Sequence, residues 1–216
     1  MQTSDANSHT SLEQLAEWFS PIRMSTFAFH SNPEALYVWN TQITKALLED
    51  IQHVEVLLRN KVDASLRDTI GELWFISNQL PHAPATRDSV IKAINRTGQT
   101  PDCVLSRDKV IAELSLDFWF YLFTKRYSTT VWPRFIAQIG ANPERKQFYQ
   151  QLGRIYRLRN RCAHHEPIVK ADFETERKAI AADQFAMHQI ANWIDPLAAE
   201  WIKAQSRVDG LRAKRP

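Results

Sequence analysis

One hydrophobic pattern constrains the fold of this chain more than any other feature of its sequence. Between residues 33 and 70, apolar side chains recur at steps of three and four, the spacing of one face of an α-helix. Asn32 suits the cap of such a helix, Pro33 its first position and Gly71 its end. The predicted buried face comprises Leu36, Trp39 (or Asn40), Ile43, Leu47, Ile51, Val54, Leu58, Val62 and Leu66.

A single helix over this range would be roughly 55 Å long, which is more than a compact domain needs. We therefore expect it to pack against a partner at one end. Two helices joined by a kink are the alternative.

Helices are also predicted for the rest of the chain, which has only five glycines and no polar–apolar alternation long enough to indicate a strand. Thr10 and Glu13 form a capping-box pattern before a short helix that Pro21 ends. Further helices are predicted over residues 87–98 and 106–127, after a capping Asn142, and over 171–208, with a break at Pro133 and a kink or division at Pro196.

Together these patterns predict an all-α fold, a helical bundle with long antiparallel helices and up-and-down connections. We expect three parts: a polar segment and short helix over residues 1–19, a helical domain over 20–205 and a basic tail over 206–216.

The composition excludes several classes of protein. A net charge of +3 is too small to indicate a nucleic-acid partner by itself. Cys103 and Cys162 are far apart, which indicates neither a disulfide framework nor a zinc site, and favours a reducing compartment. The first residues lack the basic and apolar regions of a signal peptide, and no run approaches the roughly 18 apolar residues of a membrane helix. We therefore expect a cytoplasmic protein without membrane contact.

An arginine interrupts the apolar face of the helix that follows Asn142. On a helical wheel of residues 148–163, Arg159 falls near the middle of the apolar sector, which holds Phe148, Leu152, Ile155, Cys162 and Ala163. A permanently charged guanidinium is rarely buried without a partner. The simplest interpretation is an arginine whose stem packs against the core and whose head meets a carboxylate or water.

The residues that follow favour a functional interpretation. Asn160 comes next, and His164 lies five positions after Arg159. Five positions correspond to about 140° around an unbroken helix, so the two side chains would meet only loosely. They could converge if the helix ends near Ala163, or if a second copy of the chain supplies one of them. The spacing therefore predicts a cleft at a helix end or at a dimer interface.

An arginine and a histidine in one cleft suit the cleavage of RNA. Histidine can exchange a proton with a ribose oxygen near neutral pH, and arginine can hold a phosphate through two hydrogen bonds. Because RNA carries its own nucleophile, the 2′-hydroxyl, such a site requires neither a metal ion nor a cofactor, and none is expected. The reaction would be a transesterification that leaves a 2′,3′-cyclic phosphate, and DNA should resist it.

The segment "RNRCAH", residues 159–164, resembles the R-x4–6-H signature of HEPN domains, in the subtype with a polar residue directly after the arginine. Three segments resemble the Abi-like (abortive infection) branch of that family in the same order: "VEVLLRNKVDASLRDTIGELWF" at 54–75, "VIAELSLDFWFYLFTKRY" at 110–127 and "LRNRCAHHEPI" at 158–168. The resemblance covers about residues 20–205.

This resemblance implies an all-α bundle of HEPN type, a homodimer that brings two motifs into one composite active site, and metal-independent endoribonuclease activity. Members act as toxins of toxin–antitoxin pairs or in phage defence, which implies an antitoxin protein or a small RNA as a further partner. By position, Arg159 and His164 match the fixed residues of the motif and Asn160 its polar residue, so these three are the predicted catalytic residues. His165 and Glu166 lie just outside the signature and are secondary candidates.

Two further groups of residues are candidates for the same site. Glu55, Arg59 and Asn60 lie on the long predicted helix, where Glu55 and Arg59 either form a local surface pair or help to order Arg159 and contact RNA. The second group is a basic stretch without an acidic residue, which either binds the RNA backbone or forms a solvated helix face. It comprises Arg145, Lys146, Arg154, Arg157 and Arg161.

Two other interpretations of the sequence stay open: a binding module, and a purely structural helical protein in which the motif is a coincidence. The same basic cleft could hold an RNA or an antitoxin without catalysis, so that the protein is a binding module. The run from His164 to Glu166 could suggest a metal site, but it is too short to reach one ion from a helix, and there is no HExxH motif.

Overall fold

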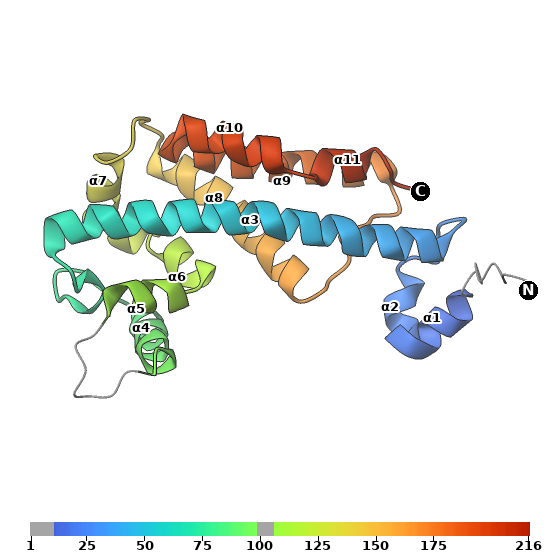
Figure 1. Cartoon of the computed structure of the whole chain (residues 1–216), viewed down its shortest axis with the longest axis horizontal. Coiled ribbons are helices and arrows are strands. Elements are labelled where there is room, and N and C mark those ends of the chain that lie inside the picture. The colour runs from blue at the N-terminus through green and yellow to red at the C-terminus, as the bar shows by residue number, and fades with distance from the viewer. Residues whose placement is uncertain (1–10, 99–105) are drawn as a thin grey trace, which may run out of the picture.

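The computed structural model describes residues 11–98 and 106–216 (Figure 1). Helices are its only regular elements in these ranges, so the all-α prediction is confirmed. Thr10, expected to form a capping box, lies outside the described residues, as does Cys103; the side chain of Ser11 instead caps α1 by accepting a hydrogen bond from the Gln14 amide. The elements are α1 (Leu12–Phe19), α2 (Pro21–Ser25), α3 (Pro33–Ile70), η1 (Trp74–Ile76), α4 (Pro84–Arg96), α5 (Arg107–Glu113), α6 (Leu116–Tyr121), η2 (Lys125–Tyr127), α7 (Val131–Ile136), α8 (Arg145–Ala163), α9 (Phe173–Ile194), α10 (Pro196–Gln205) and α11 (Val208–Arg212).

The long hydrophobic pattern forms one helix, α3, that runs along the length of the molecule (Figure 1). Asn32 caps it, with its side chain accepting from the Ala35 amide, and Pro33 occupies the first turn. All nine apolar residues predicted for its inner face are buried, and so is Asn40. Helices α7, α8, α9 and α11 of the same chain pack against α3, so its length is covered from within the chain.

The predicted apolar helix over 106–127 is wrong, because the structure divides it into α5, α6 and η2. Leu114 and Ser115 are extended between α5 and α6. The Trp119 indole nitrogen donates to the Leu114 carbonyl at 3.1 Å, and Phe118 and Trp119 are both fully buried. Core packing of these aromatic side chains therefore outweighs the continuous helical pattern.

Three boundaries at prolines also differ from the prediction or refine it. Helix α8 begins at Arg145 with Glu144 as its cap, so Asn142 is not the cap; Pro143 is buried instead of opening the helix. Pro133 causes no break, because it lies in the first turn of α7, where its missing amide proton is not needed. Pro196 does divide the last long segment, and Asp195 caps α10.

The basic segment after residue 205 packs on the bundle. It contains α11, whose Val208 is fully buried. The Trp39 indole donates to the Leu211 carbonyl at 2.7 Å, which ties α11 to α3. Arg215 then pairs with Glu176 of α9, at 2.5 Å between Nε and Oε1.

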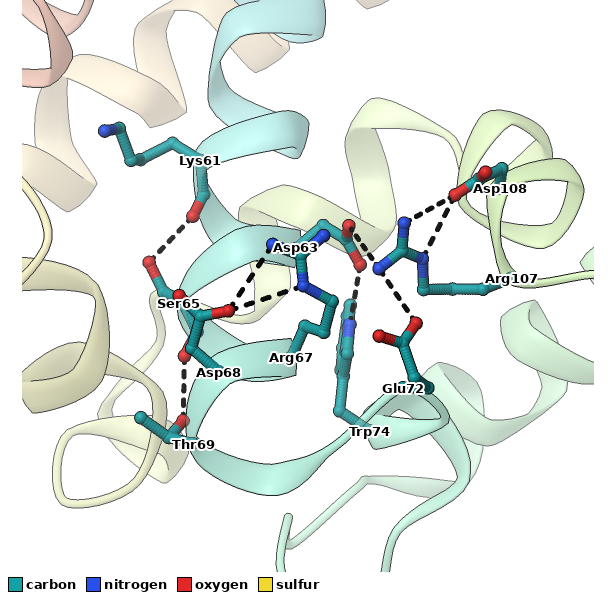
Figure 2. Close-up of polar contacts among 10 residues, drawn as sticks. All are labelled: Lys61, Asp63, Ser65, Arg67, Asp68, Thr69, Glu72, Trp74, Arg107 and Asp108. Carbon is teal, nitrogen blue, oxygen red and sulfur yellow. Dashed lines mark hydrogen bonds and ion pairs between the residues drawn. The ribbon is translucent and has the colours of Figure 1, made fainter.

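A buried carboxylate joins the far end of α3 to the elements that follow it. Asp63 accepts a hydrogen bond from the Trp74 indole at 2.8 Å and faces Arg107 at 3.7 Å, as Figure 2 shows. Arg107 also pairs with Glu72 and Asp108. This contact fixes η1 and α5 against α3.

We expect Asp63→Ala to lower the free energy of unfolding by about 1–3 kcal/mol, because the fully buried Trp74 N–H would lose its only acceptor among the described residues. Asp68→Ala, on the same helix, is the matched control. Asp68 forms an exposed pair with Arg67 (Figure 2), so its loss should cost less than about 1 kcal/mol. Urea unfolding of both variants measures the difference, and equal losses would contradict the role of Asp63.

Candidate active site

Helix α8 holds Arg159 partly buried where α8 packs against α3. Of the apolar sector predicted around it, Phe148, Leu152, Ile155 and Cys162 are buried, whereas Ala163 is exposed, because α8 ends there. One guanidinium nitrogen of Arg159 donates to the Asn160 side-chain oxygen at 3.3 Å.

Glu55 of α3 is a carboxylate whose charge acts on that of Arg159, although the two side chains form no direct ion pair. Burial raises the pKa of Glu55 above its ordinary value, and the attraction of Arg159 is the largest influence that opposes this rise, followed by that of Arg59. Glu55 also accepts a hydrogen bond from the backbone of Leu116, the first residue of α6. Glu55 thus lies near the start of α6, and the similar segments "LLRN" (57–60) and "RLRN" (157–160) each place an arginine whose charge acts on this carboxylate.

Two residues that the sequence analysis did not single out complete this group. The Tyr156 hydroxyl, one turn before Asn160, hydrogen-bonds to Asn160 and to Asp117 of α6. Burial raises the pKa of the Tyr156 phenol; the Asn160 hydrogen bond opposes this rise and the Asp117 carboxylate adds to it. A single acid within the aromatic run "LDFWFY" was the signal that could have indicated Asp117. We call this group the polar cluster: Glu55, Arg59, Asp117, Tyr156, Arg159 and Asn160.

His164 lies at the end of α8 and is exposed. Its backbone amide still donates to the Asn160 carbonyl at 2.9 Å, so it keeps a helical position. Among the described residues, no group forms a hydrogen bond or ion pair with its imidazole. The backbone positions of His164 and Arg159 are therefore about 140° apart around α8.

The other secondary candidates lie outside the polar cluster. His165 follows in the left-handed conformation, with φ of 57°, and its carbonyl accepts a hydrogen bond from Arg23 of α2. Glu166 is exposed and lies 3.7 Å from Arg161. Asn60 is also exposed, one position beyond Arg59.

The basic stretch is less free than its sequence indicates. Arg154 pairs with Asp183 of α9 at 2.6 Å, Arg145 donates to the Phe123 carbonyl and Arg161 to the Pro167 carbonyl. The stretch contains no acid of its own, but α9 places Asp183 against it. Burial raises the pKa of Asp183, and the attraction of Arg154 opposes that rise. Only Lys146 and Arg157 are exposed and without a hydrogen bond or ion pair within the described residues.

We expect Glu55→Gln to change how stability depends on pH. Because folding raises the pKa of Glu55, the folded state binds its proton more strongly than the unfolded state does. Wild-type stability should therefore fall, relative to the variant, as pH rises from 4.5 through the raised pKa, and the difference should be constant above that window. Denaturant unfolding at several pH values measures it.

Glu174→Gln is the control for this experiment, because hydrogen bonding to Arg177 lowers the pKa of the exposed Glu174. The stability that Glu174 contributes should be lost as pH falls below 4.5, whereas the contribution of Glu55 is lost as pH rises. If the free energy of unfolding of Glu55→Gln depends on pH in the same way as that of the wild type, folding does not raise the pKa of Glu55.

No family model matches the chain, and neither a curated protein nor a solved structure does. No helix in residues 11–98 and 106–216 is long and apolar enough to cross a membrane. Within the same ranges, no three His, Cys, Asp or Glu side chains gather in a way that could hold a metal ion.

Proposed function

We propose that the protein is a metal-independent endoribonuclease in which Arg159 binds the scissile phosphate and His164 transfers protons. One observation carries the proposal: the end of α8 holds both a half-buried arginine and an exposed histidine whose imidazole has no partner among the described residues. Asn160 accepts a hydrogen bond from Arg159 and the charge of Glu55 attracts it, which favours one orientation of the guanidinium before a phosphate binds.

His164 acts as the general base that removes the proton from the 2′-hydroxyl, or as the acid that protonates the leaving 5′-oxygen. The 2′-oxygen attacks phosphorus, the bond to the 5′-oxygen breaks, and a 2′,3′-cyclic phosphate and a 5′-hydroxyl result. Arg159 stabilises the charge that builds up on the phosphate oxygens. Asn160 positions Arg159, and Tyr156 holds Asn160 in place.

The active form is a homodimer of HEPN type with a composite site. Arg159 and His164 lie five positions apart, which corresponds to about 140° around α8, and this separation favours a second copy of the chain as the source of one of the two side chains. A second copy that presents its own α8 end would supply the missing partner. The proposed biological role is that of a toxin or phage-defence effector in the cytoplasm, restrained by an antitoxin protein or a small RNA.

Cleavage of RNA in EDTA tests this function. The purified protein should cut a single-stranded RNA into products with 2′,3′-cyclic phosphate ends and should leave DNA of the same sequence intact. His164→Ala, prepared in the same way, shows whether a contaminating nuclease is responsible. His188→Ala is the matched control, because His188 lies on α9 beside Glu200, outside the polar cluster.

Equal cleavage by the wild type and His164→Ala would remove the catalytic assignment. Binding of RNA or of a partner protein without cleavage of any RNA would favour a non-catalytic binding module.

A further inference from the structure

A cavity of 580 Å³ lies between α1–α2, the first half of α3 and the segment that follows α8. It is separate from the polar cluster, but His165 lines it, and His165 is the neighbour of the proposed catalytic His164. The cavity volume is within the range of sites that hold small molecules or single nucleotides.

The charge of the cavity wall is positive. Arg23 of α2 and Lys45 of α3 both line it, and none of the described lining residues is acidic. Lys45 is exposed and forms no hydrogen bond or ion pair within the described residues. Arg23 donates to the His165 carbonyl, so it is held at the side of the cavity nearest to the end of α8. Such a wall suits an anion, and a guanidinium with an ammonium suits a phosphate group.

An unpaired buried hydroxyl also lines the cavity. Thr44 of α3 is only 9% exposed, and its Oγ1 has no hydrogen-bond partner among the described residues. A buried polar group without a partner costs stability, so the Thr44 hydroxyl is available to a ligand that supplies a hydrogen-bond partner. The neighbouring Asn40 is already engaged, because its side-chain oxygen accepts from the Ile168 amide at 2.9 Å.

Aromatic rings form a third part of the wall. Phe19 of α1 stacks on Tyr37 of α3, with ring centroids 5.3 Å apart and an angle of 30° between the planes. Phe27 packs edge-on against Tyr37 from below the surface. Phe19 is 42% exposed, so the stack keeps a free aromatic surface. An exposed aromatic surface beside cations is the arrangement that binds bases of single-stranded nucleic acids without strong sequence preference.

We propose that this cavity binds a nucleotide of single-stranded RNA next to the cleaved linkage. A base stacks on Phe19, the backbone phosphate contacts Lys45 and Arg23, and a sugar or base oxygen or nitrogen pairs with the Thr44 hydroxyl. The inference rests on the proposed function for its choice of RNA, but the binding site is defined by its own residues. It makes α1 and α2 a substrate-recognition element.

Binding of a fluorescein-labelled oligouridine decamer, measured by anisotropy in the His164→Ala background, tests the site without cleavage. We expect Phe19→Ala to raise Kd about tenfold. Lys45→Ala should weaken binding and reduce the slope of log Kd against log salt by about one. Thr44→Val should weaken binding several-fold while leaving the melting temperature unchanged or higher, which a purely structural hydroxyl would not do.

Two matched controls lie outside the cavity. Lys92→Ala removes an exposed lysine of α4, and Phe185→Ala removes an exposed phenylalanine of α9. Neither should change Kd for the decamer by more than about twofold. Circular dichroism and thermal unfolding check that each variant keeps the fold. Thr44→Val should disturb the fold least, because valine has nearly the shape of threonine.

The outcomes separate this inference from the proposed function. If the wild type cuts no RNA but the three cavity variants bind the decamer more weakly than the two controls, the binding site stands and the nuclease assignment fails. If the wild type cuts RNA and the cavity variants bind the decamer like the controls, the inference is overturned. Adenosine 5′-monophosphate is the second probe. If the cavity variants bind adenosine 5′-monophosphate more weakly than the controls do but bind the decamer equally well, the cavity is a site for free nucleotides. That result would also overturn the proposed RNA subsite.

Discussion

Arg159→Ala should lower the rate of RNA cleavage by about 10²- to 10³-fold, the effect expected when a donor that stabilises transition-state charge is removed. His164→Ala should lower it by about 10²- to 10⁴-fold, the range of general acid–base catalysis. Arg159→Lys keeps the charge but loses the planar fork, so it should recover only a small part of the rate. Single-turnover cleavage of a labelled RNA measures all three.

Arg177→Ala is the matched control for Arg159→Ala. Arg177 also lies on a helix, but it is exposed on α9, where it pairs with Glu174, and it belongs to no predicted site. Its loss should leave cleavage unchanged. Equal rates for Arg159→Ala and Arg177→Ala would exclude Arg159 from the reaction.

Mixing the two inactive variants tests whether the active site is composite. In a heterodimer of Arg159→Ala with His164→Ala, one site would combine an intact arginine from one protomer with an intact histidine from the other. If the two side chains come from different protomers, the mixture should regain a substantial fraction of wild-type activity. If one protomer supplies both, or if the chain acts as a monomer, the mixture should stay as inactive as its components.

Arg215→Ala should lower the free energy of unfolding by about 3–5 kcal/mol, the cost of breaking a buried ion pair by removing one partner. Glu176 is 1% exposed, and its carboxylate accepts from Arg215 and from the Lys170 amide. The Arg215 guanidinium also lies over the rings of Trp39 and Phe173, at 5.6 and 5.0 Å from their centroids. Removing it leaves a buried charge without its counter-ion. Urea unfolding measures the loss.

Arg207→Ala provides the comparison, because Arg207 pairs with Glu49 at 2.7 Å but both side chains are about half exposed. Its loss should cost about 0.2–1 kcal/mol. Replacing Arg215 and Glu176 together with methionine should recover most of the stability, since no charge then stays buried. If Arg215→Ala and Arg207→Ala cost the same, the last residues of the chain do not stabilise the bundle.

Glu55 links the fold to the proposed chemistry. It lies near Leu116, where α6 begins after the extended Leu114 and Ser115, and its charge acts on Arg159. A change in the packing of α6 would therefore alter the position of the arginine that is proposed to bind phosphate. Gly153 allows the close packing of α6 on α8, because a Cβ atom there would lie 3.3 Å from the Phe120 ring.

The sequence by itself determined the elements whose signals are local. Helix α3 follows from an apolar period of three and four residues together with Asn32 and Pro33 at its start, and its nine predicted core residues are all buried. The candidates Arg159, Asn160 and His164 were likewise visible as a short motif on a helix. Such signals depend on neighbours a few positions apart, so no tertiary contact is needed to detect them.

Only the tertiary structure decided which charges meet. The charge of Glu55 acts on Arg159, Asp183 pairs with Arg154, and Arg215 pairs with Glu176, in each case across a long separation in the sequence. The division of residues 106–127 into separate helices had the same origin, because burial of Phe118 and Trp119 outweighed the local preference for one helix. Local pattern sets where a helix can form, whereas packing among distant residues sets where it stops and which charges are left free for a ligand.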